Sequence, residues 1–241
     1  MKRQCIPLSL LAVAVLACAA CSHSPGRPTP SSEVTPPDQI LEFSALYGQN
    51  CAGCHGPDGT GGTTIALRDP VFLAIADDTA IRRAVAGGVR GTAMPAFAQS
   101  AGGMLTDKQI DALVGGIRSW AKPGFLHGSN PPPYAAQTAG DLQHGAHVYE
   151  TFCSSCHGST ATGGNAASSI VDASYLALVS DQHLRTTVIA GRPELGAPDW
   201  REDVPGKPMS DQDVTDVVAW LASHRAPNPG QPYPSSSRVQ E

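Results

Sequence analysis

CAGCH at residues 51–55 places two cysteines three positions apart and a histidine directly after the second cysteine. CSSCH at residues 153–157 repeats this pattern 102 positions later. Residues three apart in a helical turn are neighbours on one side of the turn, so the two thiols of each pair face the same way. The chain therefore carries two copies of a site that brings together two thiols and one imidazole.

A cysteine pair of this spacing followed by histidine is the attachment signature of c-type haem. The thiols bond to the two vinyl groups on one edge of the porphyrin, and the imidazole binds the iron. A zinc site needs four ligands, usually from closely paired motifs, and a thioredoxin-like dithiol needs a βαβ context that is not visible here. We therefore expect two covalently attached haem c groups. The residues assigned to them are Cys51, Cys54 and His55 for the first haem, and Cys153, Cys156 and His157 for the second.

The N-terminal segment has the features of an export signal. Two basic residues precede the apolar run CIPLSLLAVAVLACAA, which is typical of a secretory signal peptide over residues 1–17. The small residues before its cysteines resemble the lipobox of bacterial lipoproteins. Cys18 is then the expected lipidated residue, with Cys21 as the alternative and ordinary signal cleavage as the other possibility. The sequence predicts a lipid-anchored protein on the periplasmic side of a bacterial membrane, or one secreted to the periplasm.

Composition narrows the class of protein further. Of seven cysteines, three lie in the N-terminal segment and the other four lie in the two motifs. An exported protein normally uses its spare cysteines in disulfides, and here none is left for that purpose. The net charge of −5 gives no basic footprint for nucleic acid.

The sequence around the motifs also repeats. DDTAIRRAVAGGVRGTAMPAF (77–97) aligns with SDQHLRTTVIAGRPELGAPDW (180–200), and LTDKQIDALV (105–114) aligns with MSDQDVTDVV (209–218). The offset between the copies grows only from 102 to 104, so two copies of one domain are the simplest explanation. The expected divisions are a Pro/Ser-rich tether (18–37), a first domain (38–122), a linker (123–140), a second domain (141–225) and a disordered tail (226–241).

Each copy is predicted to be helical. Thr106 with Gln109 forms a capping box, and Ser210 is a favourable N-cap; each precedes an apolar stripe of helical period. Trp120 and Trp220 are expected to pack on the first helix of their copies. The expected helices are a first one from about Asp38 or Asp141 to the motif, a middle one over 78–86 or 181–190, and a last one after Thr106 or Ser210.

With CAGCH, CSSCH, GTAMPAF and the capped last helices, the chain resembles the class I c-type cytochromes in a tandem, dihaem arrangement. The resemblance covers roughly 38–122 and 141–225. It implies an all-α fold of two cytochrome c-like helical domains, each wrapped around one covalently bound haem. It also implies that Met94, in the loop before the last helix, is the sixth ligand of the first iron, with Met104 as a distant rival. His/Met ligation raises the reduction potential.

The second copy departs from this pattern at the sixth ligand. The residue aligned with Met94 is Ala197, which cannot bind iron. Met209 is the first choice as replacement, although it aligns with Leu105, where an apolar residue often serves only as a hydrophobic staple. His183, expected at a solvent-facing position, is the second choice, and an iron with no protein sixth ligand is the third. The remaining histidines are expected at the surface: His127, His144, His147 and His224.

These features predict an electron-transfer protein rather than an enzyme, because two six-coordinate irons leave no site for a substrate. Electrons would pass one at a time from a quinol-oxidising complex or a dehydrogenase to an oxidase or a soluble cytochrome. The acidic net charge favours partners with basic patches. Two alternatives remain open. One is a dihaem enzyme of the peroxidase or thiosulfate dehydrogenase type, with an open distal site at the second haem. The other is the haem subunit of a larger oxidoreductase complex.

Overall fold

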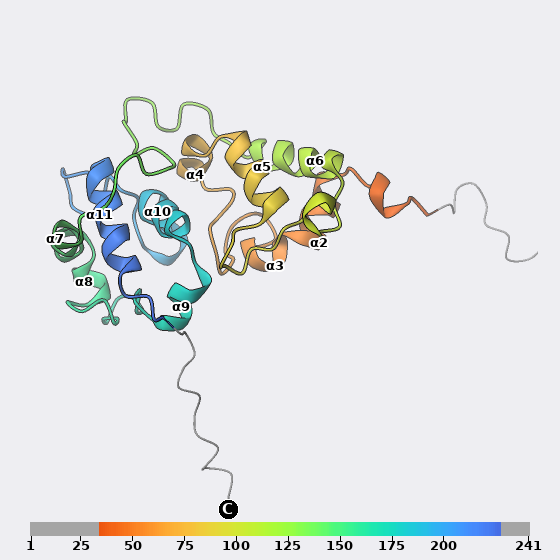
Figure 1. Cartoon of the computed structure of the whole chain (residues 1–241). Coiled ribbons are helices and arrows are strands. Elements are labelled where there is room, and N and C mark those ends of the chain that lie inside the picture. Colours follow the sequence, from red (N-terminus) through yellow and green to blue (C-terminus); the bar gives the residue numbers. More distant parts are fainter. Residues whose placement is uncertain (1–33, 228–241) are drawn as a thin grey trace, which may run out of the picture. The chain divides into compact units, whose positions relative to one another are not determined.

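The computed structural model describes residues 34–227 (Figure 1). The predicted signal peptide, Cys18 and Cys21, most of the tether and most of the tail lie outside the described residues. All regular elements in the described part are helices, apart from isolated β-bridges, which confirms the predicted all-α fold. Within 34–227, no helix is both long and apolar enough to cross a membrane.

The first copy begins its regular structure later than the sequence suggested. Its first α-helix starts at Phe43 rather than near Asp38, because the Glu42 carboxylate accepts hydrogen bonds from the next free backbone N–H groups and caps the helix there. Residues 37–39 form a separate 3₁₀ turn. The α-helices of this copy are α2 (Phe43–Asn50), α3 (Ala52–His55), α4 (Pro70–Ile75), α5 (Asp78–Gly87) and α6 (Asp107–Arg118).

The second copy repeats this order. Its first helix is capped by Asp141, as predicted, and the middle and last helices have the expected starts. Both last helices carry a complete capping box, Thr106 with Gln109 and Ser210 with Asp213. The α-helices are α7 (Leu142–Phe152), α8 (Ser154–His157), α9 (Ala173–Leu178), α10 (Asp181–Ala190) and α11 (Asp211–Ala222).

In each copy the first helix packs against the last, α2 on α6 and α7 on α11 (Figure 1). The ring of Trp120 lies edge-on to Tyr47, with centroids 5.1 Å apart, and Trp220 stacks on Tyr149 at 4.5 Å. The predicted packing of both tryptophans on the first helices is confirmed. Because each first helix runs directly into its CxxCH motif, this crossing fixes where the motif begins.

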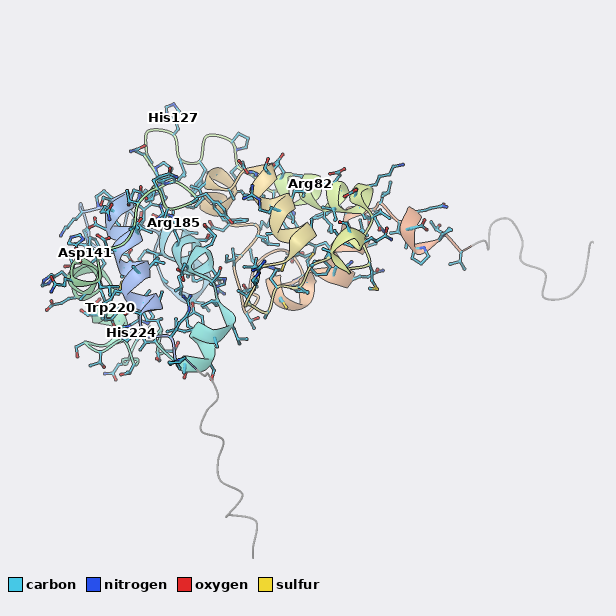
Figure 2. All side chains as sticks on the ribbon, viewed as in Figure 1. Arg82, His127, Asp141, Arg185, Trp220 and His224 are labelled. Carbon is cyan, nitrogen blue, oxygen red and sulfur yellow. The ribbon has the colours of Figure 1, made fainter. Side chains whose placement is uncertain are left out.

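The middle helix of each copy is tied to the last helix by an arginine. Arg82 on α5 pairs with Asp107 and Asp111 of α6. Arg185 on α10 pairs with Asp211 of α11, and its guanidinium also donates to the carbonyl oxygens of Pro133 and Tyr134 in the linker. The linker is therefore held against the second copy by hydrogen bonds. Figure 2 labels both arginines on their middle helices.

Candidate haem-binding sites

Each CxxCH motif forms a short helix one residue after the end of the first helix. The amide of Cys51 donates to the Tyr47 carbonyl at 2.8 Å, and the amide of Cys153 donates to the Tyr149 carbonyl at 2.9 Å. Within each motif the second cysteine amide donates to the first cysteine carbonyl at 3.2 Å. This turn sets the paired cysteines one turn apart, as thioether bonds to one porphyrin edge require.

A tyrosine on the first helix closes each motif. The Tyr47 hydroxyl donates to the carbonyl of Gly56 at 2.8 Å, and the Tyr149 hydroxyl donates to the carbonyl of Gly158. Both glycines directly follow the motif histidine. The tyrosine four residues before the first cysteine therefore anchors the end of the motif, so the repeated unit is larger than the five residues of the signature.

Both motif histidines are oriented in the same way. Nδ1 of His55 lies 2.8 Å from the carbonyl oxygen of Ile65, and Nδ1 of His157 lies 2.8 Å from that of Ser168. When Nδ1–H donates to a carbonyl, the Nε2 lone pair is left for a metal, and such an outer partner fixes the ring. Burial lowers the pKa of His55, which favours the neutral imidazole that ligation requires.

The four motif cysteines are free thiols. Burial, and then the neighbouring Cys54, raise the pKa of Cys51 to about 11. Burial, and then the charges of Asp203 and Cys156, raise the pKa of Cys153 to about 12. Each copy thus presents two reduced thiols beside one oriented imidazole. This donor set fits a covalently attached haem at both places.

Met94 lies in the loop between α5 and α6. Its amide donates to the Thr92 hydroxyl at 3.1 Å, and its carbonyl accepts from the Val89 amide at 3.0 Å. A Cβ added to Gly88 would lie 2.8 Å from the Met94 carbonyl oxygen, so α5 ends in close contact with this loop. The rival residue, Met104, is 82% exposed. Ligation by Met94 stays a prediction.

Ala197 occupies the corresponding loop of the second copy. Its amide and carbonyl both bond to the backbone of Arg192, at 3.1 and 2.9 Å. A Cβ added to Gly191 would lie 2.7 Å from the Ala197 carbonyl oxygen, just as Gly88 meets the carbonyl of Met94. The structure therefore bears out the alignment: Ala197 stands in the place of Met94.

Met209 lies at the place of Leu105. The Met209 amide donates to the Trp200 carbonyl at 2.8 Å, and the Leu105 amide donates to the Phe97 carbonyl at 2.8 Å. Both side chains are buried, with exposed fractions of 3% for Met209 and 6% for Leu105. Each residue directly precedes the N-cap of its last helix. Met209 is thus part of the hydrophobic core of the second copy.

The expectation that His183 faces solvent is wrong. Its side chain is half-buried on the first turn of α10; burial, and then the charges of Arg192 and His55, lower its pKa to about 4. Position 183 aligns with Ala80, whose small side chain gave no hint of this burial. The other four histidines are exposed, as predicted: His127, which Figure 2 labels on the linker, with His144, His147 and His224.

One acidic residue near the second motif escaped the sequence reasoning. Burial, and then Asp199, raise the pKa of Asp203 to about 7, and the charge of Asp203 acts in turn on Cys153. The loop that carries it, 201–208, has no acidic counterpart in the aligned stretch of the first copy. The acidic residues of this loop were the feature of the sequence that could have indicated Asp203.

Comparison with known proteins agrees with this geometry. The family model for cytochrome C oxidase, cbb3-type, subunit III matches residues 38–115 and again 140–221. The chain is 33% identical over 134 residues to the Cbb3-type cytochrome c oxidase subunit CcoP of Azospirillum sp. (strain B510). That match covers 51% of this chain but only 40% of the relative's length. A solved structure, the reducing HAO-like protein complex of Kuenenia stuttgartiensis, has 17% identity and a TM-score of 0.44, over 80% of this chain and 100% of that chain.

The two matched segments coincide with the two helical copies, and each contains one CxxCH helix with an oriented histidine. The chain belongs to the c-type cytochrome family described as cytochrome C oxidase, cbb3-type, subunit III.

Proposed function

We propose that this protein is a dihaem c-type cytochrome that carries electrons one at a time between membrane-associated redox complexes in the periplasm. The observation that carries the proposal is the equal setting of the two motifs. Each has a free cysteine pair on a short helix and a histidine whose Nδ1 lies 2.8 Å from a backbone carbonyl oxygen. Because equivalent hydrogen bonds orient the histidine in both motifs, both motifs are suited to bind the same group.

When bound, the haem supplies one-electron chemistry, and the chain decides how that chemistry is tuned. The carbonyls of Ile65 and Ser168 hold the imidazole rings and increase their basicity as ligands. The thioether of Met94 favours ferrous iron, because a soft ligand raises the reduction potential. Covalent attachment through the four cysteines keeps both groups in place during transient encounters with partners.

The anchor and the partners are also proposals. Lipid attachment at Cys18, or alternatively Cys21, would hold the tandem domains 38–122 and 141–225 near the membrane on a flexible tether and raise their effective concentration for membrane partners. The oxidase name of the Azospirillum relative favours an oxidase complex as acceptor, with this chain as its carrier or its haem subunit. A quinol-oxidising complex or a dehydrogenase is the proposed donor.

A second function is favoured by one specific difference. Ala197 in place of Met94, together with Asp203 beside Cys153, suits a dihaem enzyme with an open distal site at the second haem. Slow turnover of a substrate with release of product would distinguish this enzyme from a carrier, which exchanges electrons only.

The proposed function is tested on the exported full-length protein. We expect mass spectrometry to find the added mass of two haems, and acidified acetone not to extract the pigment. Cys51→Ser with Cys54→Ser should remove one haem, and Cys153→Ser with Cys156→Ser should remove the other. A chain without covalent tetrapyrrole would refute the proposal.

A further inference from the structure

The two copies differ at the residue that should complete each haem iron. Met94 in the first copy is matched by Ala197 in the second, in a loop with the same glycine contact. We infer that the second iron has no protein side chain as its sixth ligand and is open to a small neutral diatomic ligand of the carbon monoxide class. The inference rests on the covalent haems proposed above.

Met209 is fixed as a core residue. Its amide bond to Trp200 holds the backbone on one side, and the N-cap residue Ser210 holds it on the other. A residue directly before an N-cap typically packs against the fourth residue of the helix, here the fully buried Val214. Withdrawing a buried methionine from such a position costs about 2–5 kcal/mol, since it leaves a cavity. Leu105, which cannot bind iron, serves the same purpose in the first copy.

The other donors in the second copy are engaged elsewhere. His183 lies in the first turn of α10, at the place of Ala80, and not in the loop that carries Ala197. The Lys207 ammonium lies 5.2 Å from the centroid of the Phe152 ring, a cation–π contact that needs the charged form. A protonated amine has no lone pair for iron. Neither side chain therefore supplies the sixth ligand that Ala197 cannot provide.

The chemistry of ferrous haem selects among small ligands. Reduced haem iron with a free sixth position binds neutral π-acceptor molecules, whereas anions such as cyanide prefer the ferric state. A neutral diatomic molecule that binds ferrous haem is therefore the class that this site would take.

The test is a carbon monoxide titration of the dithionite-reduced full-length protein, after its two haems have been counted as pyridine haemochromes. We expect half of the haem to bind carbon monoxide. Met209→Leu, which copies the residue of the first repeat, should leave that fraction unchanged. Ala197→Met should abolish binding and double the red charge-transfer band of methionine-ligated ferric haem. Met94→Leu is the matched control, and it should double carbon monoxide uptake.

Two results would overturn the inference alone: two haems with no carbon monoxide uptake, or a Met209→Leu protein whose red charge-transfer band falls by half. A protein without covalent haem would overturn the proposed function and this inference together. Haem content is measured separately, so the two failures are distinguishable.

Discussion

In both copies the first helix crosses the last helix at a contact between one large and one small residue. The helix that carries the large residue differs between the copies. In the first copy the large residue is Phe43 on α2, and the small one is Gly116 on α6; a Cβ on Gly116 would lie 2.0 Å from the phenyl ring. In the second copy the corresponding positions are Gly145 on α7 and Trp220 on α11, and a Cβ on Gly145 would lie 2.8 Å from Trp220 Cβ. Close packing therefore constrains the total volume at the crossing, and either helix can supply it.

Other contacts have moved along the chain in the same way. His224 occupies the aligned position of Trp120, and its ring lies 4.5 Å from Trp220. Arg118 in the first copy bonds to two carbonyls at the end of α4 and to Asp78, whereas Arg225 does this for α9 and Asp181. Because the two arginines are not aligned, the contact is retained while the residue that makes it has shifted by about one helical turn.

The largest change in the free energy of unfolding is expected from substitutions of Gly145 and Trp220, the small and the large residue of the second crossing. Gly145→Phe alone should destabilise the second copy by at least about 3 kcal/mol, the upper end of the overpacking range, because the ring would collide with the Asp216 carbonyl and with Trp220. Trp220→Gly alone should cost a similar amount through a cavity. The double variant rebuilds the pairing of the first copy and should recover much of the loss. Denaturant unfolding of the full-length protein measures all three.

The reciprocal variants Phe43→Gly and Gly116→Trp provide the control in the first copy. If the double variant is as unstable as the sum of its two single variants, the crossings are not equivalent. The large and the small residue of the crossing would then not be interchangeable between the two helices.

A smaller effect should distinguish the two arginines of the middle helices. Arg82 is 37% exposed and Arg185 only 3% exposed, although both pair with an aspartate of the last helix. Arg185→Ala should cost about 2–3 kcal/mol, because it removes charge-assisted bonds from carbonyl oxygens of the linker and from the buried Thr215 hydroxyl. Arg82→Ala should cost less than about 1 kcal/mol, as for a surface ion pair. Equal losses in denaturant unfolding would show that the linker's contact with Arg185 adds no stability.

Sequence reasoning reached the parts of the fold that local chemistry determines. The CxxCH motifs, the last-helix caps at Thr106 and Ser210 and the packing of the tryptophans all follow from residue type and spacing. The short helices α4 and α9 were missed, because six residues are too few to show a helical period. Their capping residues, Asp69 and Asp172, were the signal that remained.

The sequence likewise predicted only part of each candidate site. Spacing alone indicated the cysteines and histidines. The role of Met209 could not be settled, because the alignment shifts by one residue between Trp200 and Met209, and only the hydrogen bond between them fixes the register. The partners of Ile65 and Ser168, and the burial of His183, depend on contacts between distant segments, which a single sequence does not encode in any local pattern.

The smallest expected effect concerns Asp216, which has no ionisable counterpart in the first copy, where Ala112 aligns with it. Its carboxylate is 2% exposed and accepts bonds from the Asp141 amide, His144 and Gln212. Desolvation alone would raise the pKa, but these bonds outweigh it and hold the pKa of Asp216 below its ordinary value of 3.8.

Since the pKa is lower in the folded state than in the unfolded state, the unfolded chain binds a proton first as the pH falls. The stabilisation is complete above the ordinary pKa of 3.8 and is lost progressively below it. Asp216→Asn should lower stability at neutral pH by about 1 kcal/mol and flatten the acid limb of the stability profile. Ala112→Asp is the reciprocal change, and it should add no acid sensitivity of this kind, since the first copy lacks a counterpart of His144. An Asp216→Asn protein with an unchanged acid limb would show that another carboxylate sets the acid sensitivity of the second copy.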